Sequence, residues 1–405
     1  MVKLGLDNRA MRFHTSIFRD PQALLLDFIP PNLLFRDAEL KQLHSHLLNI
    51  QNSPSKYRFI FISGRRRVGK TCIARFFGEA IQRTKSEVVT GYMDCLECNG
   101  RLSSILHSLI KRLGVSIPER GYFLEELQAS LLRLTKKKNV KLLIILDDLD
   151  FLLHNFGLEG WEKLKGVFNA LGDSLLASIC ILSNLDFINK LYPIDQEIIK
   201  NRLIRLKPYS AFEIETIIHS RVDLAFKAGS VEEEATKRIV EKVKASNGDL
   251  SFAIELLKKS GEVAEENNAD KVRLEHVEMA EDIVDRNLSG RILRKLGVHE
   301  KLLLLSVAKV LSGSKKESTS IGEIEREYAY NCRLSGLKRR CHTRILHYVK
   351  TLSLIGILKV ERSGLGYRGR TSLIGIEGLS PKSLEKIVED QLRMEGVKLT
   401  HHTSQ

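Results

Sequence analysis

The stretch from Arg58 to Phe77, RFIFISGRRRVGKTCIARFF, constrains the fold more than any other part of the sequence. Its unbroken apolar run predicts a buried strand that stops at a glycine, and the residues after Gly-Lys-Thr have helical spacing. Between them, the spacing Gly64-x-x-x-x-Gly69-Lys70-Thr71 matches the phosphate-binding P-loop. Such a loop aims backbone N–H groups and a helix N-terminus at a phosphate, so we expect the chain to hold a nucleotide.

The expected ligand is ATP or ADP with Mg²⁺, and several positions have an expected task. Lys70 should reach the β- and γ-phosphates, and the Thr71 hydroxyl should ligate Mg²⁺. Asp147 closes the apolar strand in LLIILDDLD, where a carboxylate can hold the same metal ion. The predicted nucleotide contacts are Gly64, Arg65, Arg66, Arg67, Val68, Gly69, Lys70, Thr71 and Cys72.

Two polar residues are candidates for positioning the water that attacks the nucleotide. Asp148 follows Asp147, at a position where many related ATPases carry Glu, and Asp is one methylene shorter. A shift of about 1 Å at a reacting group costs about a hundredfold in rate. Asn184 ends the strand-like run ICILSN and could fix the water or the γ-phosphate. A solvated strand end for Asp148 and a turn cap for Asn184 are the alternatives. We therefore predict a P-loop ATPase with weak or slow hydrolysis.

The rest of the chain divides by pattern into three regions. Up to about residue 208, strand-like runs alternate with helical ones, which indicates a parallel α/β sheet. From 211 to about 288 the pattern is helical, with a break at 246–250. From about 295 the sequence predicts three helices followed by a hairpin with a Gly- and Arg-rich tip, which are the parts of a winged helix.

The positive charge gathers at the C-terminal end. The formal net charge is +14, of which residues 291–405 carry +11. Residues 331–370 hold ten Lys or Arg and one acid, Glu361. So focused a charge favours a polyanionic partner, nucleic acid first, over a merely solvated surface. No apolar run approaches the ~18 residues that a membrane span needs, and the start lacks a signal-peptide core. We expect no membrane partner and a cytoplasmic, nucleoid-associated protein.

The order of these features resembles one family: the archaeal origin-recognition replication initiators of the AAA+ type. SIFRDPQALLLDFIPPNLLFRDAEL is similar to the family's lead-in, YMDC and LGVSIPERGYFLEEL to the segment with its initiator-specific insertion, and GILKVERSGLGYRGRTSLIGI to its wing. The resemblance implies an α/β AAA+ P-loop domain with a helical lid, followed by a winged-helix domain. The expected domains are a basic arm (1–20), an AAA+ base (21–208), a lid (209–290), a winged helix (291–390) and a tail (391–405).

The resemblance also implies partners and DNA contacts. The partners would be double-stranded origin DNA, paralogous initiators and the replicative helicase. A recognition helix from about Lys338 to Lys350 would enter the major groove, the wing would enter the minor groove, and the insertion would press on a minor groove. Arginines at a helix start suit contacts with bases and phosphates. The predicted DNA-binding residues are Arg120, Tyr122, Lys338, Arg339, Arg340, Arg344, Arg362, Arg368 and Arg370.

The sequence departs from the family at three places. Arg65-Arg66-Arg67 replaces the usual Thr-Gly-Thr, Ser251 stands at the sensor-arginine position, and Arg202 is only a candidate for the trans-acting finger. Missing arginines remove stabilisation of transition-state charge. The chain is therefore interpreted as a divergent paralogue. The alternatives are a signalling-type archaeal ATPase, a winged-helix transcriptional regulator, and a scaffold whose basic end binds an acidic protein.

Overall fold

The structure is a computed structural model. It describes residues 16–52, 57–65, 67–96, 98, 101–118, 121–183, 185–245, 249–294, 296–314, 317–362, 372–377 and 379–397. Contacts between Cα atoms divide the chain into two units, one of residues up to Leu34 together with Pro208–Val284, the other of Phe35–Lys207 together with the residues after Val284. Within the described ranges, we find no helix with the length and apolarity required to pass through a bilayer.

A five-stranded parallel sheet forms the centre of the base, in the order β2-β3-β4-β1-β5. Its strands are β1 (Phe59–Ser63), β2 (Val88–Asp94), β3 (Lys141–Asp147), β4 (Leu175–Leu182) and β5 (Leu203–Arg205). β1 and β4 are buried along their full length, as expected for strands covered on both faces. The parallel sheet predicted from the sequence is confirmed. β5 joins it as a short edge strand.

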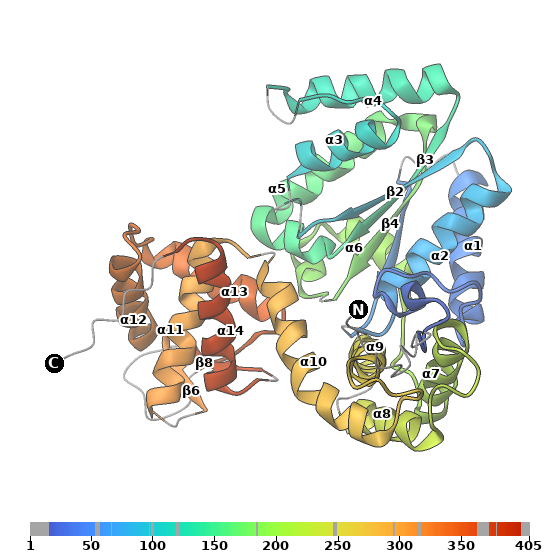
Figure 1. The fold of residues 1–405 in the computed structure, drawn as a ribbon. Helices are drawn as coiled ribbons and strands as arrows, with labels where there is room; N and C mark the ends of the chain where they lie inside the picture. The colour runs from blue at the N-terminus through green and yellow to red at the C-terminus, as the bar shows by residue number, and fades with distance from the viewer. Residues whose placement is uncertain are drawn as a thin grey trace, which may run out of the picture. The chain divides into compact units, whose positions relative to one another are not determined.

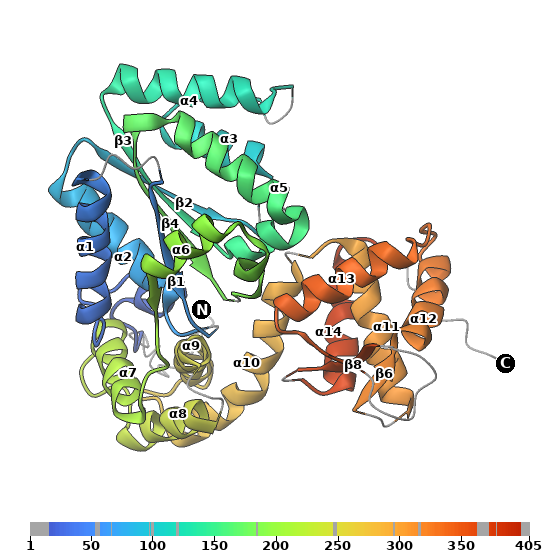
Figure 2. The same ribbon diagram turned by 180° about the vertical axis from the view of Figure 1, so that it is seen from behind.

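Helices cover both faces of this sheet (Figure 1). α1 and α2 cover one face, while α3 and α5 cover the other, as the reverse view also shows (Figure 2). An aromatic cluster anchors the second face, with the Phe59 ring 5.3 Å from Trp161 and 5.8 Å from Phe168. The helices of the base are α1 (Asp37–Asn52), α2 (Lys70–Thr84), α3 (Leu102–Arg112), α4 (Leu124–Lys138), α5 (Leu149–Ala170) and α6 (Pro193–Asn201).

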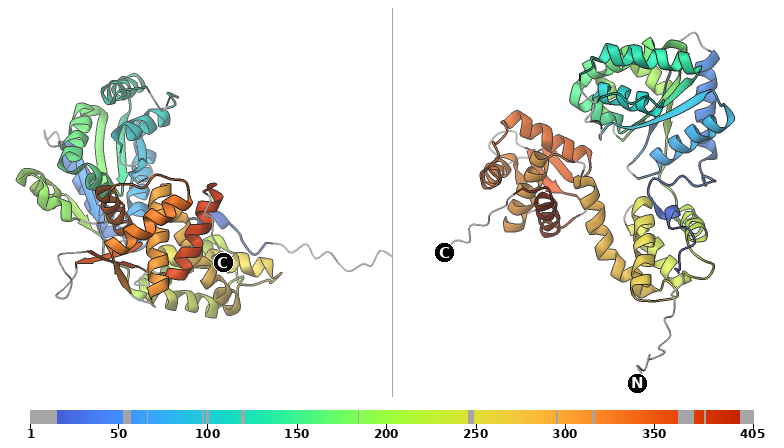
Figure 3. Two further views of the ribbon diagram at one scale, coloured as in Figure 1. Left: turned by 90° about the vertical axis from the view of Figure 1, so that its left-hand side faces the viewer. Right: turned by 45° about the horizontal axis from the view of Figure 1, so that its top comes forward.

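The lid is built from two separate parts of the chain. Its helices are α7 (Ala211–Ala225), α8 (Glu233–Ala245), α9 (Leu250–Glu266) and α10 (Leu274–Arg294). The N-terminal segment packs on α7 and α9 through the short 3₁₀ helix η1 (Pro21–Leu24) (Figure 3). The Phe18 ring lies 4.8 Å from that of Phe226, and the buried Arg221 guanidinium donates to the Ala23 carbonyl at 3.0 Å. The sequence does not predict this grouping, and the proposed domain boundaries stay predictions.

The C-terminal domain is a winged helix, as predicted. It consists of α11 (Val298–Ser314), β6 (Ser318–Ser320), α12 (Ile321–Leu334), α13 (His342–Leu354), β7 (Leu358–Arg362), β8 (Ser372–Ile376) and α14 (Pro381–Met394). The strands form an antiparallel sheet in the order β6-β8-β7. α11 is central: Leu302, Leu303, Leu304 and Leu305 are all fully buried, so the helix is covered on every side. Leu358 and Ile374 join the sheet to the same core.

Candidate functional site

The P-loop connects the carboxyl end of β1 to the first residue of α2. Gly64 starts the loop, where an added Cβ would lie 2.7 Å from the Leu206 carbonyl oxygen, so only glycine fits. Gly69 caps α2 with φ of +88°, and having no side chain it leaves the helix N-terminus uncovered. Val68 is buried, whereas Arg65 and Arg67 are exposed. Arg66 lies outside the described residues.

Lys70 directs its ammonium into the loop. Nζ donates to the carbonyl oxygens of Gly64 at 2.9 Å and Arg65 at 2.8 Å, and the residue is only 7% exposed. A positive charge thus lies inside a loop of backbone at a helix N-terminus. Both features favour a bound phosphate group, so the loop fits the nucleotide that the sequence predicts. Cys72, in the first turn of α2, is half-buried.

Asp147 is the buried carboxylate at the end of β3. Its Oδ2 accepts hydrogen bonds from the Thr71 hydroxyl at 2.6 Å and the Tyr92 hydroxyl at 2.9 Å, and Oδ1 accepts from the Asp148 N–H at 3.0 Å. Burial raises the pKa of Asp147 to about 6, and the Asp148 charge adds to the rise, while the two hydroxyl hydrogen bonds oppose it. A bound cation would remove this cost, and adjacent hydroxyl and carboxylate oxygens are ligands that Mg²⁺ takes. Thr71 and Asp147 therefore fit the predicted metal site.

Asp148 is the N-cap of α5 and has a left-handed backbone, with φ of +49°. Aspartate tolerates this conformation better than most residues. Its side chain is half-buried, next to Asp147. Its part in hydrolysis stays a prediction. Asn184 lies outside the described residues, immediately after the described end of the β4 segment.

The basic residues before α13 form an exposed run. Lys338, Arg339 and Arg340 lie in a segment that is neither helix nor strand, and α13 begins only at His342, so the predicted helix start near Lys338 was wrong. The apolar residues that a helix here can bury first appear at Ile345, and a turn built from 338–341 would have nothing to bury. Arg344 lies in the first turn, exposed, with its guanidinium 5.4 Å from the centre of the Tyr348 ring.

The other predicted DNA contacts are described only in part. In the segment between α3 and α4, where the insertion is predicted, Tyr122 is 44% exposed. Its neighbour Phe123, which was not among the predicted DNA contacts, is 74% exposed. Arg120 lies outside the described residues. In the wing, Arg362 ends β7, and its side chain is outside the described part. Arg368 and Arg370 also lie outside the described residues.

Family models match three consecutive parts of the chain. A model described as "AAA domain" matches residues 52–185, "Cdc6 AAA+ ATPase-type lid domain" matches 215–282, and "CDC6, C terminal winged helix domain" matches 291–383. An ORC1-type DNA replication protein 2 from Saccharolobus solfataricus is 28% identical over 400 residues, which is 95% of this chain and 96% of the relative. One from Sulfurisphaera tokodaii is 27% identical over 94% of each chain.

The chain is similar over nearly its whole length to ORC1-type DNA replication proteins.

Solved structures of ORC proteins have the same fold. The Aeropyrum pernix ORC1 protein in complex with DNA aligns with a TM-score of 0.75 and 24% identity, covering 94% of this chain and 99% of that one. The Aeropyrum pernix ORC2 protein, in ADPNP–ADP complexes, aligns with a TM-score of 0.61 and 21% identity, covering 93% of this chain and all of that one. The predicted architecture of AAA+ base, lid and winged helix is thereby confirmed.

Two residues beside the P-loop and Asp147 were not predicted from the sequence. Tyr92 lies on β2, and its hydroxyl donates the hydrogen bond to Asp147 described above. Arg36 immediately precedes α1, and its Nη2 donates to the carbonyl oxygens of Val68 at 3.1 Å and Lys207 at 3.0 Å. Arg36 therefore ties the P-loop to the segment that follows β5. The only signal in the sequence is an arginine just before a helix, which by itself indicates nothing about a P-loop 32 residues away.

Arg202, the candidate finger, bonds within its own chain. Its guanidinium donates to the carbonyl oxygens of Tyr57 and Phe59 at the amino end of β1. The P-loop follows the opposite, carboxyl end of that strand. Burial lowers the pKa of Arg202. A role in a neighbouring protomer stays a prediction, and it would require these bonds to open.

Proposed function

We propose that this protein is a replication initiator that binds duplex origin DNA and holds ATP or ADP with Mg²⁺. The arrangement of Lys70, Thr71 and Asp147 around the P-loop is the observation that supports nucleotide binding. The family and the exposed basic run at α13 support DNA binding. Marking origins and recruiting the replicative helicase, with or beside a paralogous initiator, completes the proposal.

The proposed nucleotide site uses the chain's own groups in fixed roles. Residues 64–72 surround the phosphates, Lys70 supplies a cation to them, and Thr71 with Asp147 holds Mg²⁺. The metal, when bound, neutralises phosphate charge. Asp148 and Asn184 are proposed to position water. The side chain of Asp148 is a methylene short, and Ser251, in the first turn of α9, cannot supply a charge to the phosphates. Hydrolysis is therefore proposed to be slow.

Nucleotide retention tests the first half of the proposal. Purified protein should keep stoichiometric ADP or ATP through gel filtration, and Lys70→Ala should lose it because the loop loses its cation. Lys41→Ala, an exposed lysine on α1, is the matched control and should retain the nucleotide. Bound ATP should be recovered mostly unhydrolysed. Retention by Lys70→Ala, or steady rapid turnover by the wild-type protein, would contradict the assignment.

The salt dependence of DNA binding tests the second half. Each phosphate contact contributes a slope of about −0.9 to log affinity against log salt. Replacing Arg339 and Arg340 by Ala should therefore weaken duplex binding and flatten the slope by about 1.8. Replacing Lys382 and Lys386 of α14 by Ala removes the same charge from the same domain and should leave the slope unchanged. Equal slopes in all three proteins would reject a DNA contact at 339–340.

Footprinting tests the cellular role. The proposal expects protection of a fixed duplex site near replication starts by the winged helix together with the insertion at Tyr122 and the wing arginines. A map of the protein across the chromosome should coincide with replication start sites. Occupancy confined to promoters would instead support a transcriptional regulator.

A further inference from the structure

A carboxylate is bonded to the most basic part of the winged helix. Residues 338–344 are all exposed and carry four Lys or Arg side chains. Among them is His342, the first residue of α13, and its Nδ1 is hydrogen-bonded to Oε1 of Glu325 on α12. An acidic group at this place lowers the positive potential that attracts DNA phosphates, so its presence calls for a reason of its own.

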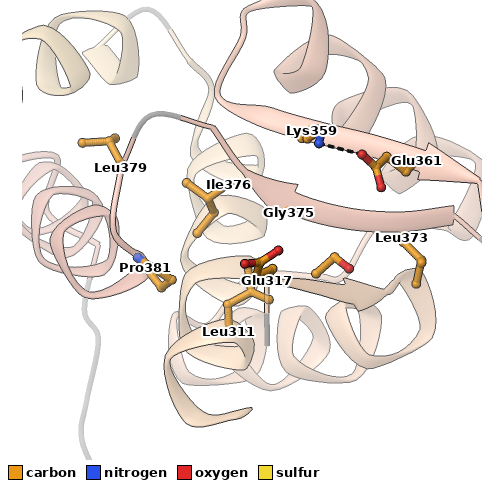
Figure 4. A pocket seen from close by; sticks show the side chains of 10 residues that line it. Leu311, Glu317, Lys359, Glu361, Leu373, Gly375, Ile376, Leu379 and Pro381 are labelled. Carbon is orange, nitrogen blue, oxygen red and sulfur yellow. Dashed lines mark ion pairs between the residues drawn. The ribbon is translucent and has the colours of Figure 1, made fainter. Parts of the chain in front are cut away.

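Another acidic residue of the domain makes an ordinary surface ion pair. Glu361 and Lys359 lie on one strand, β7, and line a cavity of about 530 Å³, with their charged groups 2.6 Å apart (Figure 4). Both side chains are more than half exposed, so this pair contributes little to stability. The pair of Glu325 and His342 differs, because it links two helices and because its donor is a ring with a second nitrogen.

The carboxylate determines which nitrogen of His342 can bind another molecule. A carboxylate only accepts hydrogen bonds, so Nδ1 carries the proton that Glu325 accepts. This holds in both charge states of the ring, and it fixes the orientation of the ring. Within the described part of the chain, Nε2 makes no hydrogen bond, and the His342 side chain is 60% exposed. The arrangement leaves Nε2 available to a group outside the chain.

The charge of the pair disfavours a phosphate contact. Glu325 with a protonated His342 has no net charge, and with a neutral ring the pair is negative. Phosphates attract the exposed arginines nearby, Arg340 and Arg344, but they are repelled by a negative pair. An oriented nitrogen suits the edge of a base, which presents hydrogen-bond donors and acceptors in the major groove. In helix-turn-helix proteins, the first residues of the recognition helix are the ones that contact base edges.

We propose that His342 contacts one base pair of the bound duplex through Nε2, and that Glu325 is the positioning residue that holds its ring. This inference rests on the proposed function and assigns a specificity-determining residue within it. Neither residue is among the DNA contacts predicted from the sequence. The neighbouring Lys and Arg side chains would bind phosphates and supply affinity, while His342 would supply sequence discrimination.

Selection from a random duplex library by the full-length wild-type protein defines the preferred site for the test. The specificity ratio is the affinity for that site divided by the affinity for a scrambled duplex of the same composition. His342→Ala should lower this ratio about tenfold, and the sequence preference should disappear at one base pair. Its salt slope should equal that of the wild type, because no phosphate contact is lost.

Glu325→Ala tests the positioning role. Ala favours the helix and removes a negative charge, so the affinity for the scrambled duplex should not fall. The specificity ratio should nevertheless fall about tenfold, because the ring loses its orientation. The double variant should have the ratio of His342→Ala alone, since Glu325 acts only through His342. Glu385→Ala on α14 removes the same charge from the same domain and should keep the wild-type ratio.

Three results would overturn the proposal. They are a wild-type ratio in His342→Ala, a salt slope flattened by about 0.9 in that variant, which would indicate a phosphate contact, and an additive loss in the double variant. The ratio does not depend on the fraction of folded protein, because that fraction scales both affinities equally. A wild-type protein that enriches no duplex would refute the proposed DNA binding itself, and this inference with it.

Discussion

Arg36 offers a sharp test of how the P-loop is held in place. The side chain is 5% exposed. Its Nη2 donates hydrogen bonds to the carbonyl oxygens of Val68 and Lys207, and its Nη1 lies 3.1 Å from Oε1 of Glu39. Arg36→Met keeps the aliphatic stem and removes every donor. Two carbonyl oxygens and a carboxylate then lose a partner, and an unsatisfied buried acceptor costs about 1–3 kcal/mol. The summed cost at the loop is about 3 kcal/mol, which corresponds to about a hundredfold in nucleotide affinity.

A fluorescent ADP analogue, titrated into nucleotide-free protein with Mg²⁺, measures this change directly. The dissociation constant should rise about a hundredfold if the full cost acts on the loop. Thermal unfolding, followed on the same samples, reports how much of the cost acts on the whole base. Arg83→Met is the matched control because Arg83 is 77% exposed on α2 and pairs only across one turn of that helix. It should alter neither measurement.

An Arg36→Met protein with the affinity of the wild type would refute the reasoning. It would mean that the loop keeps its conformation without the two hydrogen bonds, so that Lys70 and the glycines alone hold it. A lowered unfolding temperature with unchanged affinity would lead to the same conclusion about the loop. It would assign Arg36 to folding of the base.

Two further predictions concern packing in the base. Gly64→Ala should abolish nucleotide retention, because the new Cβ lies 2.7 Å from the Leu206 carbonyl oxygen. Gly166→Ala is the control and should leave retention unchanged, because its Cβ meets nothing within 4 Å. Nucleotide retention by Gly64→Ala would contradict this geometry. Lys165→Met should lower the free energy of unfolding, measured by urea titration, by about 3–5 kcal/mol, because it leaves the 1%-exposed carboxylate of Asp195 buried without its ion-pair partner. Lys163→Met, on the exposed side of the same helix, should change it by less than about 1 kcal/mol.

Much of the fold follows from local sequence patterns. β1, the P-loop and α2 are predictable because an apolar run, two glycines and a helical pattern lie within twenty residues. The winged helix is predictable from its helices and hairpin. The start of α13 is not predictable, because Lys338 to Cys341 are compatible with a helix by propensity. The helix begins only at His342, since the four residues before it have no apolar face to bury.

The residues missed at the site share one physical cause. Arg36 meets Lys207, and Tyr92 meets Asp147, across 171 and 55 positions of sequence. Neither residue belongs to a spaced motif, and both act through side-chain geometry that arises only when the sheet is assembled. Asp147 was predictable because it ends an apolar strand, and the parallel order of the sheet brings it to the P-loop.

The packing of the N-terminal segment on the lid makes the base a nested domain, inserted between the two halves of another. The ring of Phe18 lies directly on the backbone of α9 at Gly261, and the Lys227 N–H donates to the Ile17 carbonyl at 3.0 Å. During synthesis, residues 35–207 can form their sheet before residues 208–284, the second part of the lid unit, have been made. The shortest chain that folds completely therefore has to begin before Ile17. A version that begins at residue 35 would keep its P-loop and Arg36 but leave Phe226 without its aromatic neighbour Phe18.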